Sequence, residues 1–67
     1  MKFNLGDIVK IKEGTLFLAG AMGEVIGIFE GTDEYRVGFF MLTDDGDELM
    51  YDDFIYYGNE LELKRWT

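Results

Sequence analysis

Apolar and polar residues alternate along most of the chain, which is the pattern of half-buried β-strands. In the segment 7–12, Val9 and Ile11 fall on one face, while Lys10 and Lys12 fall on the other. A strand has this two-residue period because successive side chains point to opposite faces. Further runs of the same kind cover residues 23–30, 35–42, 48–51 and 60–64. The pattern therefore predicts five short strands and an all-β fold.

Turn residues separate the predicted strands. Gly14 ends the first strand, and residues 15–23 are apolar but glycine-containing, which predicts a folded-back loop. The pair Asp45-Gly46 predicts a hairpin between 35–42 and 48–51. Gly27, inside its strand, predicts either a β-bulge or a close backbone approach at a barrel corner. The run Asp52-Asp53-Phe54-Ile55 predicts one short helical or 3₁₀ turn near residues 52–55, because aspartate is favoured at a helix start.

Nine apolar residues of the strands are predicted to form the core. They are Val9, Ile11, Val25, Ile28, Val37, Phe39, Leu49, Leu61 and Leu63. This set can fill a small barrel, and five short strands joined by tight turns favour a closed or nearly closed five-stranded β-barrel. A chain of 67 residues buries only about 60% of its unfolded surface, so we expect residues 1–67 to form a single domain.

A pattern of glycine and alternating apolar residues carries a resemblance to a known fold. It consists of Gly6-Asp7-x-Val9-x-Ile11, Gly23-Glu24-Val25, Tyr35-x-Val37-x-Phe39 and Glu60-Leu61-Glu62-Leu63. Over roughly residues 5–64 the chain resembles the SH3-like small barrels, which include KOW-type modules, the photosystem I accessory subunit of this fold and the variable chain of ferredoxin–thioredoxin reductase. The resemblance implies a binding module or small subunit rather than an enzyme. The chain lacks the basic face of the nucleic-acid-binding KOW modules.

The composition excludes several kinds of chemistry. The chain has no Cys, His, Ser, Gln or Pro and only four Thr. A disulfide, a thiolate zinc site, an imidazole base and the usual nucleophile–base pairs are therefore impossible within it. Paired carboxylates remain, but a barrel of this size has no room for a cleft that excludes water. We expect no enzyme activity and no cofactor.

The negative charge is concentrated in one part of the chain. Fourteen acidic residues face six basic ones, for a formal net charge of −8. Residues 1–42 hold four basic and six acidic side chains, whereas residues 43–63 hold no basic residue. The eight acids of that second segment are Asp44, Asp45, Asp47, Glu48, Asp52, Asp53, Glu60 and Glu62. Such a field attracts basic protein surfaces and repels phosphate backbones, so we expect a basic protein partner and no direct nucleic-acid binding.

The acidic block 44–53 has three interpretations. Clustered carboxylates can bind calcium, but the spacing of Asp44-Asp45-Gly46-Asp47-Glu48 differs from that of an EF-hand loop, and we expect no metal site. The block can be a solvated hairpin tip followed by acids at a helix start. It can also be an acidic docking patch for a basic partner.

Aromatic residues exceed what a small core needs. Those left over are Phe17, Phe40, Tyr51, Phe54, Tyr56, Tyr57 and Trp66. The run Phe54–Tyr57 beside two aspartates suits a Lys- or Arg-bearing partner through cation–π contacts and charge pairing, and Phe17 lies in an apolar loop expected at the barrel rim. The candidate partner-binding residues are Asp44, Asp45, Asp47, Glu48, Asp52, Asp53, Phe54, Tyr56, Tyr57 and Phe17.

Three functions fit this sequence. The first is a non-enzymatic module that docks on a basic protein surface. The second is a phage-type inhibitor that mimics nucleic acid, which a continuous acidic stripe would favour over one patch beside exposed aromatics. The third is a small accessory subunit of an electron-transfer complex. The longest apolar stretch, residues 16–23, is too short to span a membrane, and we expect a cytoplasmic protein.

Overall fold

One antiparallel sheet of five strands makes up most of the computed structural model, which describes residues 2–64. The elements are β1 (Ile8–Ile11), β2 (Met22–Phe29), β3 (Glu34–Leu42), β4 (Glu48–Tyr57), the 3₁₀ turn η1 (Gly58–Glu60) and β5 (Leu61–Lys64). The strand order is β4-β3-β2-β1-β5. The predicted all-β class and its five strands are confirmed.

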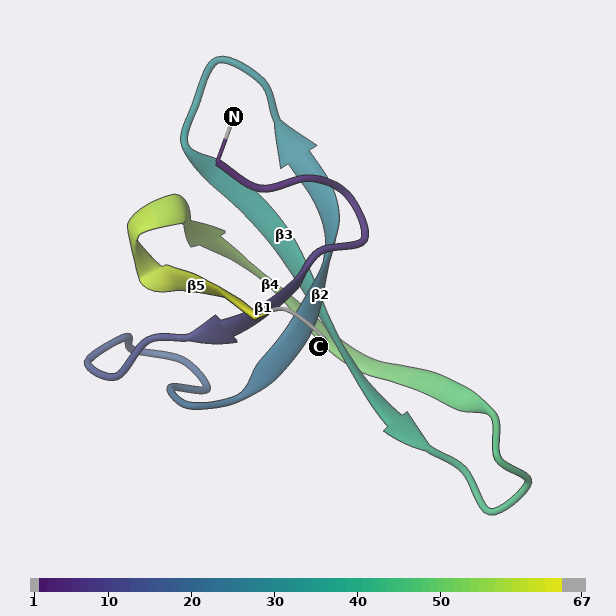
Figure 1. Cartoon of the computed structure of the whole chain (residues 1–67). Helices are drawn as coiled ribbons and strands as arrows, with labels where there is room; N and C mark the ends of the chain where they lie inside the picture. The colour runs from purple at the N-terminus through teal and green to yellow at the C-terminus, as the bar shows by residue number, and fades with distance from the viewer. Residues whose placement is uncertain (1, 65–67) are drawn as a thin grey trace.

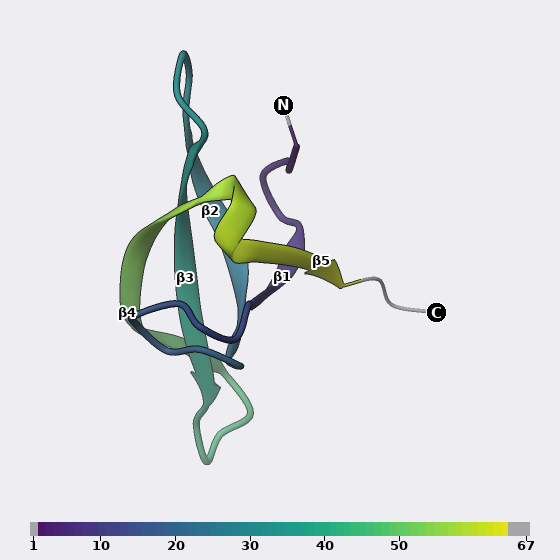
Figure 2. The same ribbon diagram turned by 90° about the vertical axis from the view of Figure 1, so that its left-hand side faces the viewer.

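The sheet curls, so that its two edge strands approach each other at one end. Figure 1 and Figure 2 show β4 bending into η1, from which β5 crosses back to β1. The pairing within residues 2–64 ends at β4 on one side and at β5 on the other. The concave face of this curl holds the core, and no further helix or strand within residues 2–64 covers the opposite, outer face.

Nine buried residues form the core. They are Phe3, Val9, Ile11, Val25, Tyr35, Val37, Phe39, Tyr56 and Leu61. Six of these were predicted, and Ile28 packs partly buried against them. The three additions are aromatic, and Phe3 meets Tyr35 edge-to-face with ring centroids 5.2 Å apart. The small sheet therefore fills its concave face with rings as well as aliphatic side chains.

The prediction that Leu49 and Leu63 belong to the core is wrong. Leu49 is 54% exposed and Leu63 is 37% exposed. Leu49 pairs with Met41 where the hairpin has run past the other strands, and Leu63 lies near the end of the edge strand β5. Alternation identifies the face of the sheet to which a side chain belongs. It does not show where the strand extends beyond the neighbouring strands that would bury that face.

The predicted turn near residues 52–55 is also wrong. These residues are extended within β4, where Asp52, Asp53, Phe54 and Ile55 pair with residues 36–39 of β3. Pairing with β3 outweighs the weak helix-start signal of two aspartates, because tertiary contacts override local propensity. The 3₁₀ turn follows at Gly58–Glu60.

Two bulges bend the sheet. One lies between Val25 and Gly27 of β2, which is the first of the two alternatives predicted for Gly27, and leaves Ile26 without a partner on β3. The other falls between Phe39 and Phe40 of β3, where β4 contributes the extra residue. A bulge increases the local twist and turns the following segment in a new direction. The second bulge marks the point where the β3–β4 hairpin leaves the rest of the sheet.

Candidate interaction surface on the hairpin arm

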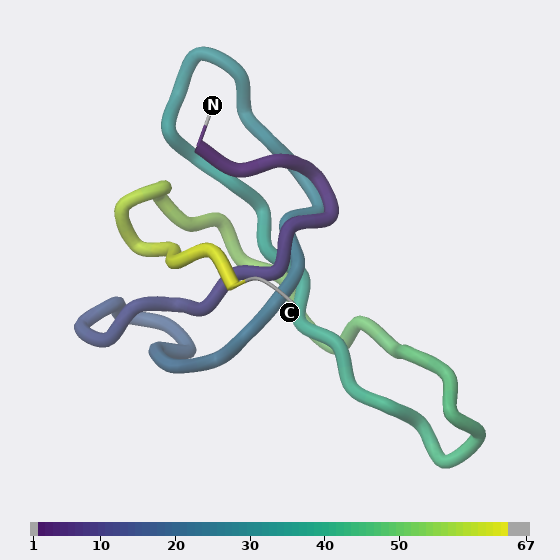
Figure 3. Tube along the Cα trace, viewed as in Figure 1, coloured from purple at the N-terminus to yellow at the C-terminus, as the bar shows by residue number. Residues whose placement is uncertain are grey.

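The distal part of the β3–β4 hairpin projects away from the other strands. We call residues 40–51 the hairpin arm; it is the long extension in Figure 1 and in the trace of Figure 3. The predicted hairpin is confirmed at its tip, where the Thr43 N–H donates to the Asp47 carbonyl at 2.7 Å. The Asp47 N–H donates back to Thr43 Oγ1 at 3.1 Å, and Gly46 takes a positive φ of 86°, which glycine adopts without strain.

Six large apolar side chains of the hairpin arm are exposed to solvent. They are Phe40, Met41, Leu42, Leu49, Met50 and Tyr51, with exposed fractions of 37% to 72%. The pairs Phe40–Met50 and Met41–Leu49 are consecutive in the ladder, so they belong to opposite faces. The arm is therefore apolar on both faces, and neither face is covered within residues 2–64.

The sequence prediction missed most of this surface. None of the six exposed apolar residues of the arm was among the candidate binding residues, and Leu49 was assigned to the core. A signal was nevertheless present, because Phe39-Phe40-Met41-Leu42 and Leu49-Met50-Tyr51 are apolar without alternation on both sides of a hairpin turn. A strand that is apolar at consecutive positions needs cover on both faces.

Four acidic residues form the end of the arm. We call Asp44, Asp45, Asp47 and Glu48 the acidic tip; all four are exposed. The ion pairs within residues 2–64 are Arg36–Asp53 and Lys64–Glu62, so none of the four tip carboxylates is neutralised there. The structure thus brings these four candidate residues together, directly beside the exposed apolar side chains.

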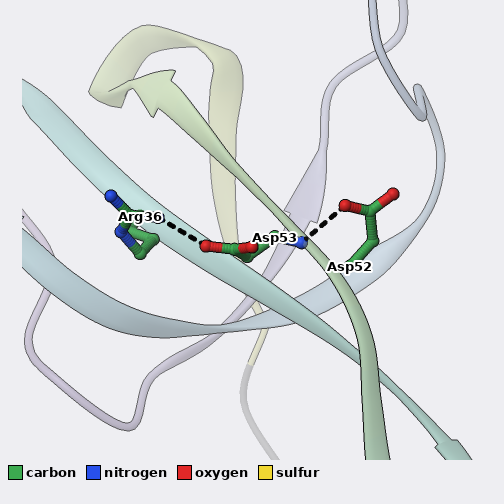
Figure 4. A network of polar contacts seen from close by, with 3 residues as sticks. All are labelled: Arg36, Asp52 and Asp53. Atoms are coloured by element: carbon green, nitrogen blue, oxygen red, sulfur yellow. Dashed lines mark hydrogen bonds and ion pairs between the residues drawn. The ribbon is translucent and has the colours of Figure 1, made fainter.

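The two remaining aspartates of the acidic block lie in a different setting. Asp53 Oδ2 pairs with Arg36 Nη1 at 2.5 Å on the outer face, as Figure 4 shows. Asp52 Oδ1 accepts a hydrogen bond from the Asp53 N–H at 2.9 Å. The charge of Asp53 is therefore largely compensated inside the molecule, while Asp52 keeps an exposed carboxylate at the base of the arm.

The run Phe54–Tyr57 does not form one surface cluster, contrary to the prediction. Because it is a strand, its members alternate, with Phe54 and Tyr56 toward the core and Ile55 and Tyr57 outward. Tyr56 is only 2% exposed, so its side chain is not available to a partner. Tyr57 is exposed, and Phe54 is half-buried beneath Phe17.

Phe17 covers the core from the loop between β1 and β2. Its ring stacks on Phe54 with centroids 5.4 Å apart and an interplanar angle of 4°. The Tyr56 hydroxyl donates to the Phe17 carbonyl at 3.1 Å. Phe17 is 55% exposed, but these contacts give it a structural role in closing the loop over β4. Trp66, which was predicted only to be left over from the core, lies outside the described residues.

A shallow open depression lies at the base of the arm. Its lining residues are Ile8, Met22, Gly23, Glu24, Phe40 and Glu48. It forms where β2 and β3 diverge, since their pairing ends at Glu24 and Gly38. The depression extends the apolar surface of the arm onto the outer face of the sheet.

Among residues 2–64, no three carboxylates converge closely enough to hold a metal ion.

The buried Tyr56 makes the stability of the fold sensitive to high pH. Burial, followed by the charges of Glu60 and Asp52, raises the pKa of Tyr56 above its ordinary value of 10.0. The folded state therefore favours the neutral phenol, and this contribution is complete below pH 10 and lost as the pH rises through the raised pKa. Deprotonation would also remove the proton that Tyr56 donates to Phe17.

Tyr56→Phe is accordingly expected to flatten the alkaline end of the stability profile. At neutral pH the lost hydrogen bond costs about 1 kcal/mol. As the pH rises above the ordinary tyrosine pKa of 10.0, the free energy of unfolding should fall less steeply than in the unmodified chain. Urea titrations at several pH values measure both effects, with the exposed Tyr57→Phe as control. Equal alkaline slopes for the two variants would contradict the assigned role of Tyr56.

A comparison of this chain with protein-family models, curated proteins and solved structures found no match. Among the described residues, no helix is long and apolar enough to cross a membrane. Within residues 2–64, the hairpin arm joins exposed apolar side chains to the acidic tip on one projecting element.

Proposed function

We propose that this chain is a non-enzymatic protein-interaction module that docks its hairpin arm on a basic protein surface. The observation that carries the proposal is the pairing of six exposed apolar side chains with an acidic tip on one projecting element. Contiguous apolar patches rimmed by polar residues are typical of protein–protein contact sites. Uncompensated charge at the rim steers a partner of opposite sign toward such a patch.

The stability of the arm supports the same proposal. A two-stranded hairpin is marginally stable in water at best when neither face is packed, and the arm has left the sheet at the bulge between Phe39 and Phe40. Apolar side chains that stay in water contribute no burial energy to the stability of this small domain. Covering them with a partner would bury both faces and order the arm at the same time.

The arrangement of the acids supports docking rather than nucleic-acid mimicry. The tip carboxylates lie next to Leu42 and Leu49, and Asp53 is paired with Arg36. A mimic of a phosphate backbone needs a continuous run of uncompensated charge. A mixed apolar and acidic patch instead suits a partner with basic side chains around an apolar centre.

The proposal is tested by loss of binding from the arm. After affinity capture from the native cell and identification of the partner, Leu42→Ser with Leu49→Ser is expected to weaken the complex at least tenfold. Both side chains are exposed, so folding should be retained, which circular dichroism checks. The matched control is Leu5→Ser with Leu16→Ser, two leucines that are exposed elsewhere on the molecule. Equal affinity of the two double variants would refute the arm as the docking surface.

The acidic tip is tested by salt dependence. Raising the ionic strength should weaken the complex, because exposed charges are screened. Asp44→Asn with Asp45→Asn is expected to remove much of that dependence, whereas Glu13→Gln with Glu30→Gln, exposed acids outside the arm, should leave it unchanged. An affinity indifferent to salt would remove the electrostatic part of the proposal.

A further inference from the structure

Alternate residues of the edge strand β4 turn their backbone groups away from β3. Antiparallel ladders alternate between pairs that exchange hydrogen bonds and pairs whose N–H and C=O groups point outward. The Gly58 N–H donates to the Asp33 carbonyl at 2.7 Å. Gly58 and Asp33 are therefore a hydrogen-bonded pair, and the pairs next to it along β4 alternate. The backbone groups that point outward are those of Tyr57, Ile55 and Asp53.

Counting from the tip gives the outward positions in the hairpin arm. Thr43 and Asp47 form a hydrogen-bonded pair, so Glu48 and, two residues on, Met50 point their backbone groups outward. The extra residue that β4 contributes at the bulge shifts the alternation by one. The backbone groups of Met50 and Asp53 therefore both point outward, although these residues are three positions apart and not two or four.

In the part of β4 that lies beyond the arm, two of the outward-pointing N–H groups already donate hydrogen bonds to carboxylates of this chain. Asp52 Oδ1 accepts from the Asp53 N–H at 2.9 Å, seen in Figure 4, and Glu60 Oε1 accepts from the Tyr57 N–H at 2.8 Å. A strand added there would have to displace both. Capped edges of this kind resist pairing with other chains. Within residues 2–64 no side-chain hydrogen bond reaches the backbone of Glu48 or Met50, so the arm half of the edge is open.

The side chains along the open half follow an order of acid, apolar and acid. Glu48 comes first, Leu49-Met50-Tyr51 follow, and Asp52 ends the series with an exposed carboxylate. Side chains of neighbouring strands lie about 5 Å apart when directly opposite, and opposite charges or apolar pairs at that distance are stabilising. The complement of this edge is an extended segment whose apolar centre is flanked on both sides by basic residues.

We infer that the partner adds such a segment as a new strand along β4 between Glu48 and Asp52. This inference rests on the proposed function and states how the arm binds. Backbone hydrogen bonds to Glu48 and Met50 supply affinity, while the flanking lysine or arginine side chains select the sequence. The capped residues beyond the arm limit how far the added strand extends.

A second copy of this chain does not fit the same edge. An antiparallel copy of β4 that paired through Met50 would place Glu48 of each chain opposite Asp53 of the other, with Asp52 next to it, so acidic residues would meet at both ends of the contact. Each chain also carries a net charge of −8. Like charges directly opposite are destabilising in a sheet. The occupant is therefore a basic segment of another protein.

Selection from a library of random short peptides tests the inference with the full chain as bait. The enriched peptides are expected to have Lys or Arg on both sides of an apolar centre. An enriched peptide is then synthesised in two methylated forms, one with methyl groups on the odd backbone nitrogens and one with methyl groups on the even ones. One form should bind at least tenfold more weakly and the other nearly as well as the unmethylated peptide, because only one set of N–H groups faces β4. In the complex, amide hydrogen exchange at Glu48 and Met50 should slow, while Asp53 and Tyr57 stay unchanged.

A pair of variants at one position separates backbone pairing from side-chain contact. Met50→Pro removes an N–H that points away from β3, so the hairpin should tolerate it, and binding of the enriched peptide should fall at least tenfold. Met50→Ala keeps the N–H and should cost much less. Circular dichroism and unfolding curves check that both variants fold, and the methylated peptides test the same hydrogen bonds on the unmodified chain.

Several results would overturn the inference. The selection could enrich no peptides, or could enrich helical or acidic ones. The affinity could survive both methylation patterns, or the peptide could slow amide hydrogen exchange at β5 instead of β4. Sedimentation could also show a dimer of this chain in which the amides of Glu48 and Met50 exchange slowly. If these occur while capture of the native partner still depends on Leu42 and Leu49, only the binding mode is wrong. If capture is independent of those two leucines, the proposed function itself is wrong.

Discussion

Replacing Phe39 with alanine is expected to remove most of the stability of the fold. Phe39 is 1% exposed, and its ring meets those of Phe54 and Tyr56 with centroids 6.4 Å and 6.3 Å away. Truncating a buried phenylalanine costs about 3–5 kcal/mol, because apolar contact is lost and a cavity remains. A domain of this length has a total stability of roughly 3–10 kcal/mol, so the variant should be partly or wholly unfolded at room temperature.

The adjacent Phe40 provides the matched control. It has the same side chain and is in the same strand, but it belongs to the outer face of the arm, where it is 37% exposed. Phe40→Ala should cost less than half as much free energy as Phe39→Ala. Urea unfolding followed by circular dichroism measures both values. Equal losses would show that the assignment of the two faces of β3 is incorrect.

Gly23→Ala is expected to lower the melting temperature by roughly 10 °C. A methyl group at Gly23 would lie 2.7 Å from the Gly38 carbonyl oxygen and 2.7 Å from Val37 Cγ1. The carbonyl belongs to β3 and moves only if the sheet moves, so the overpacking should cost about 2 kcal/mol. An alanine would otherwise suit a strand better than glycine does, which makes the sign of the effect informative.

Gly38 is the control for this substitution because it is a glycine of the neighbouring strand, paired with Glu24 next to Gly23. A methyl group there would lie 3.1 Å from both Ile26 Cδ1 and Met50 Sδ, which are the ends of flexible side chains on the open outer face. Gly38→Ala should therefore shift the melting temperature by only a few degrees. Differential scanning calorimetry compares the two variants, and a larger shift for Gly38→Ala would contradict the packing described between β2 and β3.

The sequence predicted the strands more reliably than the segments between and beyond them. Val9 with Ile11, and Val37 with Phe39, are buried as their alternation indicated. The bulge at Gly27 and the hairpin at Asp45-Gly46 follow from the chemistry of single residues, and both are present. The turn expected near residues 52–55 is absent, since pairing with β3 keeps that segment extended.

The candidate site was only partly predictable. The acidic tip was predicted because the charge of a side chain follows from the residue type alone. Its four residues are exposed in the structure. Tyr56 was misplaced, because an aromatic residue beside aspartates fits a binding surface and a strand interior equally well. Its burial depends on the loop that brings Phe17 over β4, a contact between residues far apart in the chain.

The sequence by itself determined the all-β class, the five strands and the concentration of acidic residues after position 42, because these depend on local periodicity and residue type. Only the tertiary structure decided which apolar residues are covered. Leu49 and Val9 look alike in the sequence, yet Val9 lies between neighbouring strands in the core and Leu49 projects into solvent on the arm. Burial requires a second surface, and whether one is present at a given place depends on how far each strand runs past its neighbours.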